Sequence, residues 1–361
     1  MKPKVAKVKT NLLSIDIGNH SVKIAVGQKS GDKLKVTNLV KQQLPNGVFD
    51  DGRLVDELTL KTVIQSLIKE NHIKIKDAVL TYESQDIIKR EMIVQKVDVV
   101  DQLDLITFEV SQYLPIDIEA YVLQYQVLEE IEEDNNVKLK ILIGAVPRET
   151  VKMLYDLLHN CGLNPLYMDM HSNSLEKFIE YSFDSIRINK TIAFIDFGHK
   201  IIDISIFENG KYKFNRLLRL GSGEFDRILV EQLDLPIDEA ELRKKKTSLM
   251  AINEASTQEE FDVNDVKKVV IKETANYVNE CMDEISKVFK YYTSRNVDNT
   301  IDHIYVCGGG SQFKDLVSLF RERFEINTDV MNNYGSIEIA SKNPVEELPV
   351  YVHAVGALIR K

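Results

Sequence analysis

The sequence predicts an α/β protein made of two duplicated lobes. The first observation is a repeat: residues 12–28 and 191–212 each contain an apolar run, an Asp-x-Gly turn and a second β-branched run. The second is that each repeat opens a similar series of strands and a helix, and a long repeat of this kind marks a duplicated domain. The third is the length of 361 residues, which exceeds what one ordinary core accommodates.

Composition places the chain among globular proteins. Hydrophobic residues make up 44% and charged residues 28%, as in soluble folded domains. The formal net charge of −10 opposes binding to nucleic acid, which needs a basic surface that displaces counterions. The sequence has no apolar run of about 18 residues, so we expect no transmembrane helix and no direct insertion into a membrane. Three scattered cysteines, Cys161, Cys281 and Cys307, fit a reducing cytoplasm.

The first repeat is followed by a long insertion. Residues 11–49 alternate between apolar and polar side chains over three strands, and residues 54–72 carry apolar residues at helical spacing. In the insertion, residues 98–113 predict a helix that stops before Pro115, because residues that precede proline avoid the helical region. The other predicted elements are strands at 76–84, 122–133 and 137–147 and a helix at 148–161.

The second repeat starts the series again. Residues 191–221 predict three strands, and a helix follows at 223–233. Residues 237–265 are polar and charged, so we expect a flexible region with room for short helices. One long amphipathic helix is predicted at 266–294. A strand, a glycine turn and a helix are then predicted within 302–324, a strand at 326–331 and a final helix at 352–361.

The two Asp-x-Gly turns predict an anion site. A tight turn between two strands points backbone N–H groups into a cleft, and Gly18 and Gly198 let an anion approach without interference from a Cβ atom. Asp16 and Asp196 would supply carboxylate oxygens to Mg²⁺ through water. We therefore expect one hairpin in each lobe to hold the same polyphosphate and its metal ion.

The glycine run after the strand near residue 304 predicts a third part of the same site. Gly308, Gly309 and Gly310 would let an adenosine lie on the backbone, and the N-terminus of the following helix would favour phosphate. Taken alone, the glycine run is equally compatible with a tight structural turn, and each Asp-x-Gly turn is a weaker signal still. The three motifs in this order are a much more specific signal.

Together these motifs resemble the phosphate 1, phosphate 2 and adenosine motifs of the actin, Hsp70 and sugar-kinase superfamily. The stretch "DIGNHSVKIAV", residues 16–26, resembles the first motif of the branch that contains FtsA and PilM. Residues 108–130, 141–178 and 220–246 resemble the PilM family, cytoplasmic actin-like proteins of type IV pilus assembly. The resemblance runs through nearly the whole chain and is weakest at about 246–265.

The resemblance implies an actin-like fold, a ribonuclease H-like duplicated two-lobe ATPase with an FtsA-type subdomain inserted in lobe I. Lobe I would comprise residues 1–189 and 336–361, with the inserted subdomain at about 79–166. Lobe II would comprise residues 190–335, with a smaller subdomain at about 224–295.

The resemblance also implies that ATP and Mg²⁺ bind at the three motifs. "AELRK" matches the family's AE-x-x-K pattern, which makes Glu241 and Lys244 candidates for ribose and adenine contacts. Ser21 would lie beside the phosphates, and Lys23 would neutralise phosphate charge. The residues carried over are Asp16, Gly18, Asn19, His20, Ser21 and Lys23 for phosphate 1; Asp196, Gly198, His199 and Lys200 for phosphate 2; Glu241 and Lys244; and Gly308, Gly309, Gly310 and Ser311 for adenosine.

As for partners, PilM-like proteins hold the cytoplasmic N-terminal tail of PilN, a bitopic inner-membrane protein, in a groove beside the inserted subdomain. They thereby connect the pilus alignment complex to the cytoplasmic motor or platform components. For this chain, the resemblance implies a cytoplasmic scaffold that lies at the inner face of the membrane through its partner.

The second phosphate motif departs from the family pattern in a way that bears on hydrolysis. It reads "DFGHKIID", so Ile201 and Ile202 stand where the family has hydroxyl residues, while Asp203 is retained. His199 and Lys200 replace small residues and would either reach the γ-phosphate or project into solvent. Because phosphoryl transfer depends on positioning and electrostatics, we expect ATP binding with slow hydrolysis at most.

Three other functions are compatible with the same superfamily. An FtsA-like division protein would carry an amphipathic membrane helix after its last core helix, whereas this sequence ends at "VGALIRK", so we expect no such anchor. A small-molecule kinase would need a carboxylate base beside a substrate hydroxyl, and no sugar-binding motif lies between the phosphate motifs. A filament-forming actin homologue shares the nucleotide motifs, so the sequence leaves that alternative open.

Two further groups of residues are read as structural. His171, His303 and His353 are isolated in the sequence, and such histidines are more often structural than catalytic. The apolar stretch 113–128 predicts the core of the inserted subdomain, with a few exposed side chains available to line a peptide groove.

Overall fold

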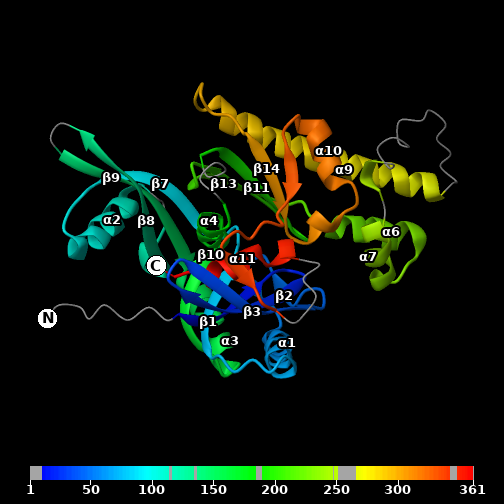
Figure 1. The fold of residues 1–361 in the computed structure, drawn as a ribbon, viewed down its shortest axis with the longest axis horizontal. Helices are drawn as coiled ribbons and strands as arrows, with labels where there is room; N and C mark the ends of the chain where they lie inside the picture. Colours follow the sequence, from blue (N-terminus) through cyan, green and yellow to red (C-terminus); the bar gives the residue numbers. More distant parts are fainter. Residues whose placement is uncertain are drawn as a thin grey trace. The chain divides into compact units, whose positions relative to one another are not determined.

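A computed structural model describes residues 10–113, 116–133, 136–183, 189–246, 248–250, 266–341 and 348–360 (Figure 1). The chain divides into two compact units, each of which is described by itself. Unit 1 contains residues 1–11, 24–39 and 172–361, and unit 2 contains residues 12–23 and 40–171. The lobe boundaries expected from the sequence stay a prediction.

Unit 2 contains a parallel arrangement of three strands. β1 (Asn11–Ile17) and β10 (Asn164–Met170) both pair with β6 (Asp77–Tyr82), and the start of β2 (Ser21–Ser30) lies on the other side of β1. From Leu12 to Ile17, β1 is buried at every residue, as expected of a parallel strand covered on both faces. Helices α1 (Glu57–Glu70) and α3 (Arg148–Asn160) contact each other, and β4 (Phe49–Asp50) pairs with β5 (Arg53–Leu54).

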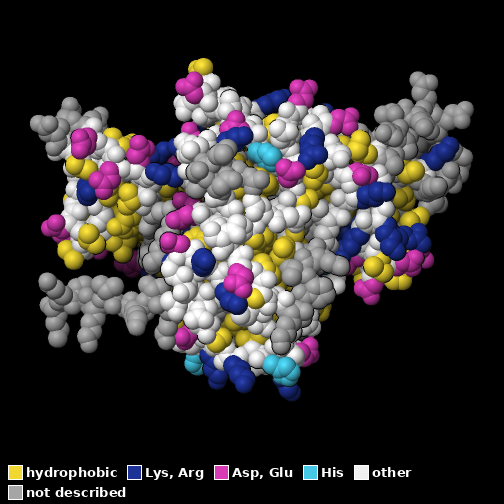
Figure 2. All heavy atoms as spheres, viewed as in Figure 1, with side chains coloured by type: hydrophobic (Ala, Val, Ile, Leu, Met, Phe, Trp, Pro, Cys, Tyr) yellow, Lys and Arg dark blue, Asp and Glu magenta, His cyan; other side chains and the backbone are white. Residues whose placement is uncertain are grey.

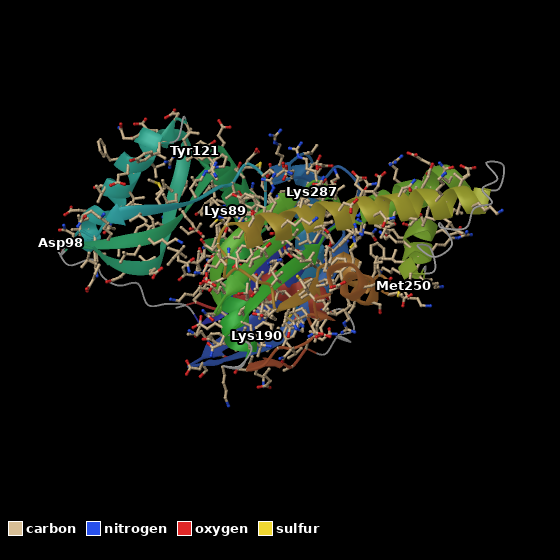
Figure 3. All side chains as sticks on the ribbon, turned by 90° about the horizontal axis from the view of Figure 1, so that it is seen from above. Lys89, Asp98, Tyr121, Lys190, Met250 and Lys287 are labelled. Atoms are coloured by element: carbon tan, nitrogen blue, oxygen red, sulfur yellow. The ribbon has the colours of Figure 1, made fainter. Side chains whose placement is uncertain are left out.

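The insertion predicted after the first repeat folds as an antiparallel sheet with one helix. β7 (Ile88–Gln95) and β8 (Tyr121–Glu133) flank β9 (Asn136–Pro147), and α2 (Val99–Tyr113) lies between β7 and β8 in the chain. Figure 3 labels Lys89 in β7, Asp98 just before α2 and Tyr121 at the start of β8. The core of this part consists of Val94, Ile106, Val110, Leu123, Leu139, Ile141 and Ile143.

Unit 1 contains a five-stranded sheet in the order β13-β12-β11-β14-β15. The second repeat forms β11 (Thr191–Phe197), β12 (Ile202–Glu208) and β13 (Lys211–Leu218), which pair antiparallel. β14 (His303–Cys307) and β15 (Thr328–Val330) extend the sheet in parallel. The long helix α9 (Val266–Ser294) packs Val278, Met282, Ile285 and Phe289 into the same core as β11 and β12 (Figure 1).

The remaining elements of unit 1 include two helices in direct contact. α4 (His171–Ser182), whose first residue belongs to unit 2, meets α11 (Val352–Ala357) so closely that a Cβ atom at Gly356 would lie 2.0 Å from the Ser174 carbonyl oxygen. The main part of β2 lies beside β3 (Lys33–Gln43), which pairs with β16 (Ile337–Ile339).

Several predicted helices differ in extent from the structure. The helix expected after the glycine turn begins at Leu316 (α10, Leu316–Phe324), and a 3-10 turn, Gly309–Gln312, lies between it and β14. The final helix ends at Ala357. Within the polar segment 237–265, α7 (Ile237–Lys246) is a helix, and residues 247 and 251–265 lie outside the described residues.

α6 (Gly223–Leu233) and α9 have the bounds that the sequence predicts. In the part of the chain that the structure describes, no helix combines the length and the apolar character needed to cross a bilayer.

Candidate functional site

The first Asp-x-Gly turn, in unit 2, connects β1 to β2. It closes when the backbone N–H of Gly18 donates to the carbonyl oxygen of Ser21 at 3.1 Å. The Asn19 side chain accepts a hydrogen bond from the backbone N–H of Asp51 at 2.9 Å, and the His20 carbonyl accepts one from the chain just after β3. These hydrogen bonds connect the turn to the β4–β5 hairpin and to the chain that leads into it.

Asp16, near the end of β1, is contacted at both carboxylate oxygens. The Nζ atom of Lys23 donates to Oδ2 at 3.0 Å, and Nε2 of His171 lies 3.2 Å from Oδ1. Only 1% of the Asp16 side chain is exposed. Lys23, which is expected to neutralise a phosphate, forms an ion pair with this carboxylate in the structure. Ser21, two residues before Lys23, is buried.

The second Asp-x-Gly turn, in unit 1, is closed in the same way. The Gly198 N–H donates to the Ile201 carbonyl at 3.0 Å, and a Cβ atom at Gly198 would lie 2.6 Å from that oxygen. The carbonyls of Gly198 and His199 accept hydrogen bonds from the backbone N–H groups of Ser222 and Gly223, at 2.9 and 2.8 Å. The amides at the start of α6 are thus bonded to the turn itself.

The two residues after Gly198 point to different surroundings. The His199 ring packs over the start of α6, where a Cβ atom at Gly223 would lie 2.6 Å from the ring. Nδ1 of His199 lies 3.9 Å from Oδ2 of Asp226. Lys200 is exposed. Whether Lys200 or His199 reaches the γ-phosphate stays a prediction.

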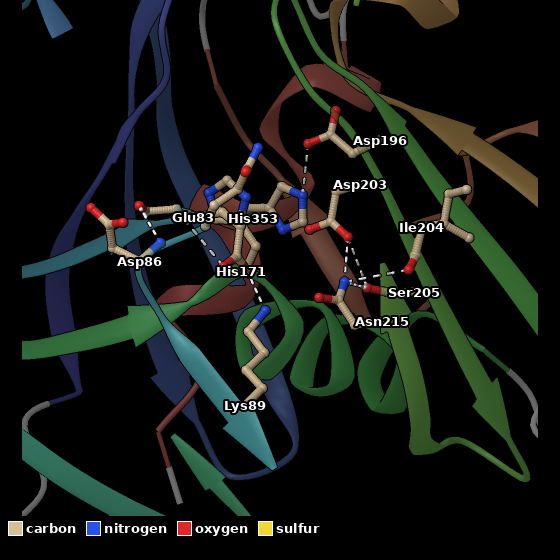
Figure 4. Close-up of polar contacts among 12 residues, drawn as sticks. Glu83, Asp86, Lys89, His171, Asp196, Asp203, Ile204, Ser205, Asn215 and His353 are labelled. Carbon is tan, nitrogen blue, oxygen red and sulfur yellow. Dashed lines mark hydrogen bonds and ion pairs between the residues drawn. The ribbon is translucent and has the colours of Figure 1, made fainter. Parts of the chain in front are cut away.

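Asp196 lies opposite Asp203 in the β11–β12 register, and each carboxylate has its own partner. Nε2 of His353, on α11, lies 3.0 Å from Oδ2 of Asp196 (Figure 4). The amide of Asn215, on β13, and the hydroxyl of Ser205 donate to Asp203. These separate partners keep the two acidic side chains apart, although they face each other across the strands.

The three glycines after β14 have different reasons for being glycine. Gly308 adopts φ +76° and ψ −178°, a region that is essentially limited to glycine, and a Cβ atom there would lie 1.8 Å from Oδ1 of Asp196. A Cβ atom at Gly310 would lie 2.4 Å from the Phe197 ring, whereas one at Gly309 would meet nothing within 4 Å. The Ser311 hydroxyl donates to the Gly308 carbonyl at 2.7 Å.

Lys244, on α7, forms a buried ion pair with Asp226 on α6. Its Nζ atom donates to the Asp226 carboxylate and to the Ser222 carbonyl at 3.2 Å, and it lies 5.8 Å from the centre of the Phe313 ring. Burial raises the pKa of Asp226 and lowers the pKa of Lys244, while the attraction between the two charges works in the opposite direction. Glu241 lies close enough to affect the pKa of both groups.

The structure therefore brings several predicted residues together within each unit. In unit 2, Lys23 contacts Asp16; in unit 1, Gly308 lies beside Asp196. Sequence reasoning missed the partners that hold these groups, namely His171, His353 and Asp226. Asp226 and His171 had a local signal, since they lie within the stretches 220–246 and 141–178 that resemble the PilM family, whereas His353 lies outside these stretches.

The aspartates provide the carboxylate oxygens that Mg²⁺ prefers, but they differ in how well they fit the role. Asp196 keeps 19% of its side chain exposed and has His353 at one oxygen. Asp16 is 1% exposed, with Lys23 and His171 at its two oxygens. Asp196 therefore fits contact with a hydrated cation, and Asp16 fits it less well.

Comparison with known proteins gives the family. The family described as type IV pilus assembly protein PilM matches residues 14–361. This chain belongs to the PilM family. The extent of the match agrees with the resemblance that the sequence motifs indicated, and it makes the chain an actin-like protein of type IV pilus assembly.

Individual relatives share little sequence identity with this chain. The cell division protein FtsA of Bacillus subtilis (strain 168) is 22% identical over 385 residues, which cover 96% of this chain and 82% of FtsA. A solved PilM-PilN type IV pilus biogenesis complex matches with a TM-score of 0.80 at 17% identity, covering 97% of this chain and 98% of the other. MreB 5 of Spiroplasma citri bound to AMPPNP matches with a TM-score of 0.52 at 11% identity, covering 97% and 95%. These likenesses confirm the actin-like fold.

Proposed function

We propose that this chain is a nucleotide-binding scaffold of type IV pilus assembly that binds the cytoplasmic N-terminal segment of a PilN-like inner-membrane protein. The observation that carries the proposal is the family match over residues 14–361. It is supported by the similarity to the fold found in a PilM-PilN complex. Through that partner the protein would lie at the inner face of the membrane and connect it to motor or platform components.

Nucleotide binding is supported by the second turn and the glycine run in unit 1. Asp196, at the end of β11, lies beside Gly308, whose conformation only glycine adopts readily. Proteins of this fold, such as MreB 5, have been solved with a bound nucleotide. Mg²⁺ bound with ATP would neutralise phosphate charge, and Asp196 is the residue that fits contact with it.

Hydrolysis, by contrast, is not favoured by the second turn. Ile201 and Ile202 have no hydroxyl group that could orient water or a metal ligand, and Ile202 is fully buried. Because phosphoryl transfer depends on such positioning, the chain would turn ATP over slowly if at all. A bound nucleotide would then act by favouring one conformation of the protein. This requires that the nucleotide binds two conformations of the protein with different affinities.

The inserted antiparallel sheet offers an apolar surface for the partner. On α2, Ile106 and Val110 are buried against the sheet, while Val100 and Phe108 are 76% and 64% exposed. Figure 2 shows hydrophobic side chains gathered over the part of the molecule where Figure 1 labels α2. Exposed apolar patches of this kind mark protein interaction sites, and an apolar peptide segment would bury them.

Binding of a labelled peptide tests the proposal. The peptide would copy the N-terminal cytoplasmic segment of the PilN-like protein from the same organism, and fluorescence anisotropy would be measured with and without Mg-ATP. Saturable binding that changes with Mg-ATP, and loses this change in Asp196→Asn, supports a nucleotide-linked scaffold. Absence of binding in every nucleotide condition rejects the PilN-like partner and favours the FtsA-like or filament-forming alternative.

A surface variant tests where the peptide binds. Phe108→Ala should weaken peptide binding if the peptide lies on α2. Tyr291→Ala is the matched control, since Tyr291 is a 55% exposed aromatic residue on α9. Equal affinity of both variants and wild type would place the peptide elsewhere in the molecule.

A further inference from the structure

A histidine contacts the aspartate of each Asp-x-Gly turn. In unit 1, Nε2 of His353 lies 3.0 Å from Oδ2 of Asp196 (Figure 4). In unit 2, Nε2 of His171 lies 3.2 Å from Oδ1 of Asp16. The histidines come from α11 and α4, outside the duplicated strand–turn–strand stretches. The same contact in both halves, made by helices that the repeat does not include, indicates a role at the turns.

The His353 ring is held firmly in place. Its side chain is 5% exposed, and the neighbouring Ala354 and Val355 are fully buried. α11 packs against α4 with a Cβ position at Gly356 only 2.0 Å from the Ser174 carbonyl oxygen. A shift of α11 toward α4 is therefore blocked, which restricts the movement of the imidazole.

Asp196 is confined from a second direction. A Cβ atom at Gly308 would lie 1.8 Å from Oδ1, so the backbone at Gly308 passes directly beside that oxygen. Oδ2 is the oxygen that contacts His353. The carboxylate is therefore held between the start of the glycine run and the imidazole, which fixes its orientation.

We propose that His353 is a positioning residue for the divalent metal ion that accompanies the nucleotide, an inference that rests on the nucleotide binding proposed above. An ionised carboxylate can only accept hydrogen bonds, so Nε2 must carry the hydrogen and donate it to Oδ2. The imidazole thereby fixes the orientation of the Asp196 carboxylate through a hydrogen bond. Outer partners of this kind orient the groups that bind a metal ion and strengthen the binding.

The inference predicts a specific dependence on metal concentration. Binding of a fluorescent ATP analogue would be measured while Mg²⁺ is titrated, for wild type, His353→Leu and His353→Gln. The Mg²⁺ concentration for half-maximal binding should rise about tenfold or more in His353→Leu, as for other outer partners of metal ligands. His353→Gln should have a Mg²⁺ midpoint close to that of wild type, because the amide N–H of glutamine can donate to Oδ2 of Asp196. Binding of the analogue in EDTA should stay unchanged in both variants.

A second histidine–aspartate pair in unit 1 supplies the matched control. Nε2 of His303 lies 2.9 Å from Oδ2 of Asp329, and His303 is the first residue of β14, at the end of the strand opposite to Gly308. His303→Gln should leave the Mg²⁺ dependence as in wild type. If histidine–aspartate pairs had only a structural role, the His353 and His303 variants would weaken nucleotide binding to the same extent. The weakening would then be the same with Mg²⁺ and in EDTA.

The outcomes separate this inference from the proposed function. Wild type that binds no nucleotide at any Mg²⁺ concentration rejects the proposed nucleotide binding and this inference with it. Wild type that binds, with His353→Leu showing the same Mg²⁺ midpoint, overturns only the role of His353. If His353→Leu fails to fold, His353→Gln is compared with His353→Asn, whose shorter amide does not reach Oδ2. Equal midpoints for these two variants overturn the inference, and a higher midpoint for His353→Asn supports it.

Discussion

Lys244 and Asp226 form an ion pair inside unit 1, where 10% and 1% of their side chains are exposed. The folded state raises the pKa of Asp226 above its usual value of 3.8, mainly because burial disfavours the charge. Its contribution to stability is therefore complete below pH 3.8 and is lost as the pH rises through the folded pKa. Burial lowers the pKa of Lys244 from 10.5, so its contribution is complete above 10.5 and is lost as the pH falls through the folded pKa. At neutral pH the burial of the two charges costs folding free energy, and the attraction between Lys244 and Asp226 offsets part of this cost.

Removal of one charge should therefore be more harmful than removal of both. Lys244→Met leaves the Asp226 carboxylate buried without its cation and should lower the free energy of unfolding by about 3–5 kcal/mol. The double variant Asp226→Leu/Lys244→Met should recover most of this loss. Urea unfolding at pH 7 without nucleotide measures both values. A double variant that is no more stable than Lys244→Met would contradict the coupling of the two side chains.

Gly308 and Gly309 should respond very differently to alanine. Gly308→Ala forces a non-glycine residue to φ +76° and a Cβ atom to within 1.8 Å of Asp196, so it should displace that carboxylate and abolish Mg-ATP binding. Gly309→Ala adds a Cβ atom where no protein atom lies within 4 Å, so its melting temperature should match wild type. Isothermal calorimetry and thermal melting provide the readouts. Equal loss in both variants would mean that the glycine run is needed for another reason.

The cysteines should be unreactive in the folded protein. Burial raises the pKa of Cys281 to about 12 and that of Cys161 to about 11, and Cys307 is buried. At pH 8 only roughly one Cys161 thiol in a thousand would be a thiolate, the form that reacts. The stability contributed by the protonated Cys281 is complete below its unfolded pKa of 9.0 and is lost as the pH rises toward 12.

A thiol assay with DTNB at pH 8 checks this expectation. The native protein should show no rapid phase, and all three thiols of the sequence should react once urea unfolds the chain. Rapid reaction of one thiol before unfolding would show that its surroundings open in solution.

The inserted sheet should depend on its own small core. Ile141, on β9, is fully buried in that core, so Ile141→Ala should cost about 2–5 kcal/mol through lost burial and a cavity. Val100→Ala, at a 76% exposed position on α2, should change stability by no more than about 0.5 kcal/mol. Hydrogen exchange of the β7 to β9 amides reports the local effect. Similar protection in the two variants would show that this core contributes little to the sheet.

The sequence by itself determined the elements that depend on local pattern. The duplicated strand–turn–strand stretches appear as β1–β2 and β11–β12, and α9 spans Val266–Ser294 as its apolar spacing predicts. The motifs also indicated the PilM family, and the match over residues 14–361 confirms it. Alternation, helical spacing and Asp-x-Gly turns are properties of neighbouring residues, so they can be read without knowledge of the fold.

The late start of α10 follows from the glycines. Gly308 has positive φ, and glycine is a poor helix former, so the backbone makes a 3-10 turn before a helix begins at Leu316. The sequence pattern predicted the strand, the glycine turn and the helix in this order, and the structure adds the 3-10 turn between the strand and the helix.

Only the tertiary structure decided which side chains hold the acidic groups of the motifs. His353 is 157 residues from Asp196 in the chain, and His171 is 155 residues from Asp16. Lys244, a candidate for ribose or adenine contacts, forms an ion pair with Asp226. Such contacts arise when helices pack against the ends of strands, and no local periodicity encodes them. For this reason the sequence named the aspartates and glycines of the candidate site, whereas the fold supplied the partners that position them.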